Sequence, residues 1–221
     1  MTEFIATDLE GTLTAGQAWR GMRSYLEANQ YKRHFRRFYF SKVPDLLKMR
    51  LGRQTLGNFK MEWMSGMLHL FAGFSREEFA KVADWVVEAE LWPKRRQDVL
   101  DELRREQENG RSILIVTGMF EPIISRFAEK AGGFDFIGTP IAYDGDVLTG
   151  KTAAPFNLGA KKVESLKPYT INAPLYAAYG DTAPDIPMLK SSQRPVAVYP
   201  DEELRETAVS LNWRIIEKTE D

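Results

Sequence analysis

Short, continuous apolar runs separated by helix-like stretches constrain the fold of this chain more than any other feature. Each run is rich in β-branched residues and shows no alternation with polar side chains. Strands of this kind are buried on both faces, as the central strands of a parallel sheet are. The predicted strands are residues 3–8, 112–118, 134–138, 175–181 and 195–198.

Amphipathic stretches lie between these runs. Residues 95–110 place their apolar side chains on one face and end at Gly110, as helices tend to, and residues 121–133 and 158–166 follow the same scheme. Strands that alternate with helices along a chain form a doubly wound α/β sheet. The sequence therefore predicts a Rossmann-like α/β core built on a parallel sheet.

The alternation is interrupted once, between the first two strands. From about Thr14 to Trp92 the sequence has helical periodicity, many aromatic residues and methionines, and no convincing strand. Ser75 and Glu78 have the spacing of a capping box, which marks the start of a helix. We expect two parts: an α/β core of residues 1–13 and 93–221, and an all-helical cap of residues 14–92.

A β-hairpin is predicted over residues 138–150, with its turn at Asp144–Gly145. The stretch between this hairpin and the next helix is short. No large insertion therefore follows the second long strand, and the helical cap alone would control access to the core.

Composition narrows the chemistry. The chain has no cysteine, which excludes a disulfide scaffold, a thiolate zinc site and cysteine catalysis. Its two histidines, His34 and His69, are too few for a multi-histidine metal centre; we expect His34 to be solvated and His69 to pack. Any catalysis must use carboxylates, hydroxyls and lysines, with or without a bound metal.

The formal net charge of −1 gives no sign of a nucleic acid or a membrane as partner. No apolar run approaches the roughly 20 residues of a membrane-spanning helix, and Glu3 and Asp8 interrupt the start of the chain, where a secretory signal would be apolar. We expect a soluble cytoplasmic protein.

The charge is unevenly divided. Residues 14–93 hold 13 Lys and Arg against 8 Asp and Glu, whereas the remainder holds 17 against 23. The stretch 31–40 is both basic and aromatic, which suggests RNA or membrane binding, but its spacing favours an amphipathic cap helix with the aromatic side chains inward. A basic cap over an acidic core would concentrate an anionic substrate.

Polar residues stand where the predicted strands end. They are Asp8, Thr117, Asp181 and Asp185, together with the pair Lys161–Lys162 at the start of a helix. Ligands of an open α/β sheet bind at the carboxyl ends of its strands. Three carboxylates and a lysine suit phosphoryl transfer, because carboxylates hold Mg²⁺ while the lysine and hydroxyl neutralise phosphoryl oxygens. Asp8 can act as a nucleophile.

Four motifs in order carry a resemblance to a known family. They are D-x-D-x-T, here Asp8 to Thr12; a strand ending in Thr117-Gly118; a lysine opening a helix; and G-D-x-x-x-D, here Gly180 to Asp185. The chain resembles the haloacid dehalogenase (HAD) superfamily over essentially its whole length, and specifically its phosphoserine-phosphatase-like branch, subfamily IB-like, with a helical C1-type cap.

The resemblance implies roles for the first motif and the metal ligands. Asp8 would attack phosphorus and ligate Mg²⁺. Glu10 would give its backbone carbonyl to the metal and its side chain to acid–base work. Asp181 would ligate the metal and Asp185 would orient metal-bound water.

The resemblance also implies the phosphate-binding residues. Thr117 and the amide of Gly118 would hold the phosphoryl group. Lys162 would balance the charge between nucleophile and phosphate. We prefer Lys162 to Lys161 because Leu166 then follows four residues on, as in the family pattern, but both remain candidates.

Glu10 departs from the family pattern, in which most members have Asp. A backbone carbonyl ligand is indifferent to the side chain, but proton transfer depends on reach. Some phosphoserine/homoserine phosphotransferase-like relatives carry the same D-x-E. Two alternatives to hydrolysis therefore stay open: phosphoryl transfer to an alcohol acceptor, and a weakly active module that binds polyanions.

The resemblance thus implies a Mg²⁺-dependent phosphatase that hydrolyses a small phosphorylated metabolite through an aspartyl-phosphate on Asp8. Phosphoserine phosphatases usually carry a glutamate nine residues after the nucleophile, where this chain has Gln17, which offers no charge to an ammonium group. The cap arginines that are candidates for binding a substrate carboxylate are Arg20, Arg23, Arg50 and Arg53. The sequence leaves the substrate and the oligomeric state open.

Overall fold

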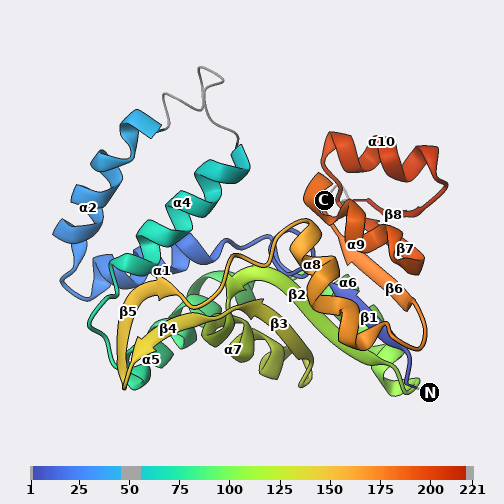
Figure 1. The fold of residues 1–221 in the computed structure, drawn as a ribbon, viewed down its shortest axis with the longest axis horizontal. Helices are drawn as coiled ribbons and strands as arrows, with labels where there is room; N and C mark the ends of the chain where they lie inside the picture. Colours follow the sequence, from blue (N-terminus) through green and yellow to red (C-terminus); the bar gives the residue numbers. More distant parts are fainter. Residues whose placement is uncertain (1, 46–55, 218–221) are drawn as a thin grey trace.

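A computed structural model describes residues 2–45 and 56–217 of the chain. Its main sheet has six strands in the order β3-β2-β1-β6-β7-β8, and every neighbouring pair is parallel (Figure 1). The strands are β1 (Phe4–Thr7), β2 (Ser112–Phe120), β3 (Asp135–Thr139), β6 (Leu175–Gly180), β7 (Ser192–Val198) and β8 (Arg214–Ile216). The predicted parallel sheet is confirmed.

The largest differences from the predicted strands concern β2, β7 and β8, and the other strand limits agree to within one residue. β2 runs on to Phe120, with a shift in its register against β3, and helix α7 starts at the next residue. β7 begins at Ser192 rather than at Pro195. β8 was not predicted: it is a three-residue edge strand without a buried residue, so it leaves no apolar run in the sequence.

Helices cover both faces of the sheet (Figure 1). They are α6 (Gln97–Glu108), α7 (Glu121–Ala131), α8 (Ala160–Leu166), α9 (Ile186–Lys190) and α10 (Glu202–Ser210). Ile5 of β1 packs with the apolar side chains of α6 and α7, while the next residue, Ala6, packs with those of α8, α9 and α10. Neighbouring residues of one strand therefore enter two separate cores, as a doubly wound sheet requires.

A helical insertion separates β1 from β2. It contains α1 (Ala18–Ala28), α2 (Lys32–Ser41), α4 (Leu56–His69), α5 (Arg76–Val86), a π-helical turn at Val87–Leu91 and a 3₁₀ turn, Trp92–Lys94. Between residues 14 and 92, the part that the structure describes holds no strand. The capping box at α5 is confirmed, with both Ser75 and Glu78 accepting from the other's backbone N–H. The chain limits of the cap, residues 14 and 92, stay a prediction.

The predicted hairpin consists of β4 (Ile141–Asp144) and β5 (Val147–Thr152), which pair antiparallel. It fastens the insertion to the core: Leu148 exchanges backbone hydrogen bonds with Gly73 and Phe74 at 2.8 Å, and the Arg76 guanidinium lies over the Tyr143 ring. β5 also packs against α4, so the hairpin and the insertion are in direct contact (Figure 1).

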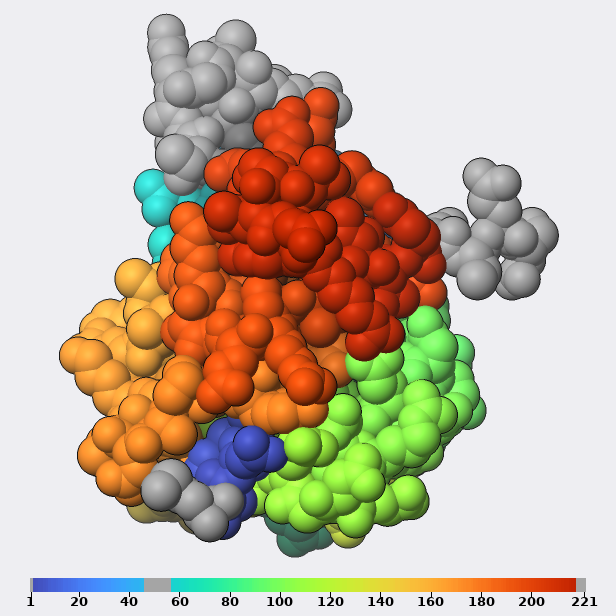
Figure 2. Space-filling model, turned by 90° about the vertical axis from the view of Figure 1, so that its right-hand side faces the viewer, coloured from blue at the N-terminus to red at the C-terminus, as the bar shows by residue number. Residues whose placement is uncertain are grey.

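The C-terminal segment closes the opposite end of the molecule. In Figure 2 this segment, in red, lies between the orange residues around β6 and the green residues around α6. Glu102 of α6 holds it there, accepting hydrogen bonds from Arg214 and from the Tyr179 hydroxyl. Within the described ranges, no helix has the length and apolar character that crossing a membrane demands.

Candidate functional site

The loop after β1 carries the first motif. The backbone N–H of Asp8 donates to the Tyr179 carbonyl at 3.0 Å, so this residue continues the pairing of β1 with β6. Gly11 has a φ of +98°, and a Cβ added there would lie 1.9 Å from Oδ2 of Asp181. Only glycine fits this turn. Arg96 fixes it further by donating to the Gly11 carbonyl from its side chain and to the Leu13 carbonyl from its backbone.

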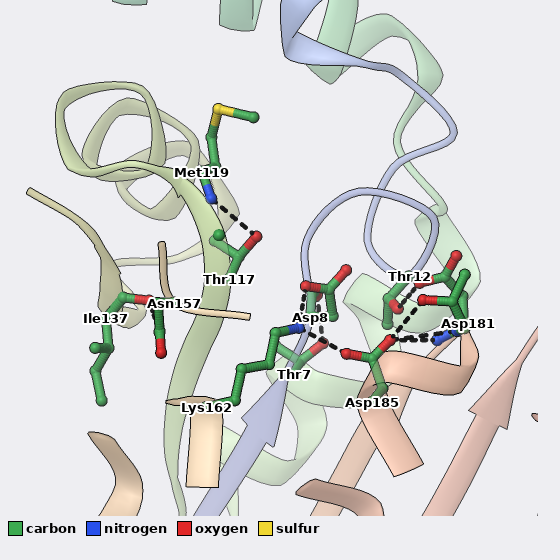
Figure 3. A network of polar contacts seen from close by, with 12 residues as sticks. Thr7, Asp8, Thr12, Thr117, Met119, Ile137, Asn157, Lys162, Asp181 and Asp185 are labelled. Carbon is green, nitrogen blue, oxygen red and sulfur yellow. Dashed lines mark hydrogen bonds and ion pairs between the residues drawn. The ribbon is translucent and has the colours of Figure 1, made fainter. Parts of the chain in front are cut away.

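A buried ion cluster lies beside this loop (Figure 3). Nζ of Lys162, at the start of α8, is 2.6 Å from Oδ1 of Asp8 and 2.6 Å from Oδ1 of Asp185. Lys162 is 2% exposed and Asp8 is 7% exposed. Lys161 instead points outward and pairs with Glu164. Of the two candidate lysines, Lys162 is therefore the one that the fold brings to the cluster.

Burial and pairing act against each other in this cluster. Burial raises the pKa of the Asp8 carboxyl above its ordinary value, and the Lys162 ammonium partly reverses that shift. Burial alone would lower the pKa of Lys162, but the carboxylates of Asp185 and Asp8 outweigh it and raise that pKa. The lysine is thus firmly cationic, which keeps a carboxylate beside it ionised despite its burial.

Asp181, directly after β6, completes the acidic side of the site. Its Oδ1 accepts a hydrogen bond from the Thr12 hydroxyl at 3.2 Å. Burial and the nearby carboxylates of Asp8 and Asp185 raise its pKa. These three acids each offer an oxygen within 4.8 Å of the other two. Three carboxylates face the single ammonium group of Lys162, and carboxylate oxygens are the ligands that a hard divalent cation prefers.

Asp185 organises the loop between β6 and α9. Its Oδ2 accepts from the backbone N–H and hydroxyl of Thr182, both at 3.2 Å, and from the N–H of Asp181 at 3.3 Å. Asp185 is the N-cap residue of α9, but its side chain makes no capping bond to that helix. Asp185 instead holds the short 3₁₀ turn Ala183–Asp185 and Lys162 at the same time.

Glu10 points elsewhere. Its Oε1 accepts a hydrogen bond from the backbone N–H of Ala18, the first residue of α1. The Gln17 side chain does not cap this helix, so Glu10 takes that place, which suits a carboxylate at a helix N-terminus. Burial raises the pKa of Glu10 from 4.5 to about 7. The structure thus ties the predicted acid–base residue to the helical insertion rather than to the ion cluster.

Thr117 and Gly118 lie within β2, across from Asp8 (Figure 3). The Thr117 side chain is buried, and its Oγ1 accepts from the Met119 N–H at 3.4 Å. The Gly118 carbonyl accepts from the Thr139 hydroxyl at 2.8 Å, and Leu158 packs against this glycine. Within the described residues, neither hydroxyl nor amide bonds to Asp8 or Lys162.

Sequence reasoning missed three residues that support the site. Thr12 lies inside the first motif, so its spacing could have marked it as a partner of Asp181. Arg96 has no such signal, because it is one of several adjacent cations. Asn157 is a buried amide in the loop before α8, where it accepts from Ser165 and donates to the carbonyl of Ile137. No pattern in the sequence marks it.

Haloacid dehalogenase-like hydrolases match the chain over residues 5–190. A protein with unknown function from Bordetella pertussis Tohama I superposes with a TM-score of 0.80 at 21% identity, over 98% of this chain and 99% of that one. A phosphoserine phosphatase, solved as a phospho-aspartyl intermediate analogue, superposes with a TM-score of 0.64 at 16% identity, over 100% and 95%. At these identities the likeness shows the fold.

A curated relative also matches part of the sequence. It is the inhibition of morphological differentiation protein of Streptomyces azureus, 28% identical over 113 residues. The matched stretch is 49% of this chain and 40% of that protein, so this relative extends well beyond the shared part.

Proposed function

The chain belongs to the haloacid dehalogenase-like hydrolase family, and from this premise we propose that it is a Mg²⁺-dependent phosphatase of small phosphomonoesters that works through an aspartyl-phosphate on Asp8. The observation that carries the proposal is the buried cluster in which Lys162 contacts both Asp8 and Asp185 at 2.6 Å, beside Asp181. A nucleophile, a fixed cation and further metal-ligating oxygens are the parts that phosphoryl transfer needs.

The donor set fits a magnesium ion. The carboxylates of Asp8 and Asp181 and the backbone carbonyl of Glu10 would hold it, and Asp185 would support them through its bonds to Lys162 and to the Asp181 N–H. Bound Mg²⁺ supplies positive charge that offsets the mutual repulsion of the carboxylates and the phosphoryl oxygens.

The chemistry proceeds in two displacements. A carboxylate oxygen of Asp8 attacks phosphorus, the phosphorus–oxygen bond to the leaving group breaks, and the leaving oxygen takes a proton from Glu10. Water then gives a proton to Glu10 and attacks phosphorus, which releases phosphate and restores the Asp8 carboxylate. The raised pKa of Glu10, about 7, suits a group that must both give and accept a proton near neutral pH.

Two further parts of the chain support these steps. Lys162 keeps the carboxylate of Asp8 ionised and offsets the charge of the incoming phosphoryl group. Thr117 and the Gly118 amide would hold phosphoryl oxygens on the side of Asp8 nearest β2. The Ala18 N–H bonds to Oε1 of Glu10, so Oε2 is the oxygen that would exchange a proton with the leaving group and with water.

Phosphoserine is not favoured as the substrate. Gln17 is exposed and carries a neutral amide, so it offers an ammonium group no charge. Its Oε1 also already accepts a hydrogen bond from the Trp19 indole N–H at 2.9 Å. Arg23 pairs with Glu27 and is thereby occupied. Arg20 lies over the Trp19 ring, while Arg50 and Arg53 fall outside the described residues. We therefore propose a small phosphomonoester as the substrate, without naming the organic group that carries the phosphate.

The Glu10 position favours a second candidate, transfer of the phosphoryl group from Asp8 to an alcohol. An acid–base group bonded to Ala18 rather than to the ion cluster would slow the activation of water. If this candidate holds, added glycerol or homoserine raises the release of the leaving group above the release of phosphate.

A screen of small phosphomonoesters for Mg²⁺-dependent phosphate release tests the proposal. Asp8→Asn should abolish release, as should EDTA, whereas Asp135→Asn, at an exposed acid on β3, should leave it unchanged. Undiminished release by the Asp8→Asn protein would overturn the mechanism. No release from any ester, together with tight binding of a polyanion, would favour the binding module instead.

A further inference from the structure

An open cavity of about 790 Å³ lies in the helical insertion, apart from the ion cluster. Its walls are α2 and α4, and Gly150 and Phe156 close one side (Figure 1 shows the two helices). The walls are held close at two points: Phe38 packs against Gly66, and the helix α4 residue His69 packs against Gly150. A cavity of this size is in the range that holds a small organic ligand.

The two helices present matched faces to this cavity. On α2, His34, Arg37 and Ser41 recur at helical spacing, and on α4, Glu62, Ser65 and His69 do the same. Both histidines of the chain therefore line one cavity. His69 is exposed here, not packed between its leucine neighbours as the sequence suggested.

The lining combines apolar surface with positive charge. Phe38 and Phe156 offer aromatic faces. Lys42 is shared between Asp45 and Glu62, at 3.4 and 3.9 Å, and Glu62 is the one acid among the lining residues. Arg37 is exposed and makes no ion pair within residues 2–45 and 56–217. Its guanidinium is the charge left for a ligand, and guanidinium groups bind carboxylate, sulfonate and phosphate well.

The cavity also adjoins the phosphate-binding side of the core. The Phe156 ring lies 6.1 Å, between centroids, from that of Phe120 at the end of β2. Two residues on, Leu158 packs against Gly118. The same loop continues into α8, which carries Lys162. A ligand against Phe156 therefore touches the segment that connects the cavity to the proposed catalytic lysine.

We propose that this cavity binds a small amphipathic anion, with an aromatic body between Phe38 and Phe156 and its anionic group at Arg37. Two sources share this chemistry: the non-reacting part of the phosphatase substrate, and a separate ligand. That the ligand is part of the substrate rests on the proposed function, whereas the claim that the cavity binds such an anion does not.

Fluorescence titration with 8-anilinonaphthalene-1-sulfonate tests the binding in the full chain carrying Asp8→Asn, at about 0.15 M salt, where long-range charge effects are screened. We expect saturable binding at one site per chain. The uncharged analogue N-phenyl-1-naphthylamine should bind at least about tenfold more weakly, which is about 1.4 kcal/mol. Equal affinity for both probes would overturn the anion site.

Variants on both walls locate the site. Arg37→Glu should weaken binding of the sulfonate by about tenfold or more, and Ser65→Trp should do the same by filling the cavity. Arg33→Glu is the matched control, because Arg33 is an exposed cation on the same helix that does not line the cavity. Equal losses in the Arg37 and Arg33 variants, or unchanged binding by the Arg37 variant, would contradict the proposal. Unaltered circular dichroism shows that each variant is folded.

Steady-state kinetics with 1-naphthyl phosphate separate the two sources. If the cavity holds part of the substrate, the sulfonate raises KM and leaves kcat unchanged. If it holds a separate ligand, the sulfonate does not compete with the substrate. If 1-naphthyl phosphate is not hydrolysed, the competition is measured with an ester that the screen identifies; no hydrolysis of any ester would overturn the phosphatase proposal, while the titration still decides the binding site.

Discussion

The ion cluster of the core and the cavity of the insertion use charge in opposite ways. In the core, Lys162 is 2% exposed and forms ion pairs with two carboxylates, those of Asp8 and Asp185, each at 2.6 Å. In the insertion, Arg37 is exposed and without an ionic partner among the described residues. A buried charge must be paired by its own chain, so it fixes its neighbours. An exposed charge is solvated and can be paired by a ligand, so it does not hold neighbouring side chains in place.

Removing the buried cation should have the largest effect on both stability and phosphate release. Lys162→Met leaves Asp8 and Asp185 facing each other without compensation, so we expect a loss of roughly 3–5 kcal/mol in the free energy of unfolding. Phosphate release should fall by about a thousandfold or more, because the cation beside the proposed nucleophile is lost. Urea unfolding and steady-state kinetics measure the two effects.

Lys161→Met is the matched control for that variant. Lys161 is adjacent and exposed, and its ion pair with Glu164 lies on the surface, so its loss should cost no more than about 0.5 kcal/mol. Comparable losses in the two lysine variants would mean that the buried pairing is not what distinguishes the core site.

Gly11→Ala tests how tightly the core site is built. The added methyl group would meet Oδ2 of Asp181 at 1.9 Å in a backbone conformation that alanine resists. We expect a loss of roughly 2–4 kcal/mol and a higher Mg²⁺ requirement. Gly145→Ala shares the positive φ but has no atom within 4 Å of the new methyl group, so it should cost only about 1–2 kcal/mol. Thermal unfolding of the two variants compares them.

The acidic side of the core predicts how stability depends on pH in EDTA. The pKa of Glu10 is raised from 4.5 to about 7, so the folded chain holds this proton more tightly than the unfolded chain does. The stabilisation is complete below about pH 4.5 and is lost as pH rises through about 7, by roughly 1–2 kcal/mol for a partly exposed group. The raised pKa values of Asp8 and Asp181 act in the same direction.

Magnesium should reverse that trend, because it binds the ionised carboxylates. The increase in Tm on adding Mg²⁺ should therefore be larger at pH 8 than at pH 5. An equal increase at both pH values, or stability in EDTA that rises from pH 5 to pH 8, would contradict the electrostatic account of the site.

The exposed cations of the insertion should have the smallest effect. Arg33→Glu with Arg36→Glu reverses two exposed charges of α2, and we expect kcat/KM for an anionic ester to fall by about two- to fivefold at low salt. The difference should vanish near 0.5 M salt, where charges are screened within a few ångströms. A loss that persists at high salt would show that these arginines act through contact rather than through their field.

The core could be predicted from the sequence because burial leaves a trace in residue order. Runs such as 112–116 are apolar on both faces, so they revealed the parallel strands. Asp8, Asp181 and Asp185 lie at or just after strand ends, so their positions predicted that they meet. Of the pair Lys161–Lys162, the family resemblance favoured Lys162. β8 was missed because a short edge strand is half-buried and needs no apolar run.

The orientation of side chains in the site was less predictable. In the sequence Glu10 lies close to Asp8, and nothing indicates that its carboxylate accepts a hydrogen bond from the N–H of Ala18, at the start of α1. The cavity was equally hidden, because His34 and His69 lie far apart in the chain and neither belongs to a motif. Contacts between helices depend on packing, for example of Phe38 against Gly66, which no periodicity encodes.

The most direct test of the central claim is to locate the phosphoryl group during turnover. The wild-type chain is mixed with Mg²⁺ and p-nitrophenyl phosphate, quenched in acid and analysed by peptide mass spectrometry. The account predicts a phosphoryl group on Asp8 that hydroxylamine removes and that is absent from the Asp8→Asn protein. Steady phosphate release with the phosphoryl group on another residue, or with none on Asp8 at any quench time, would contradict it.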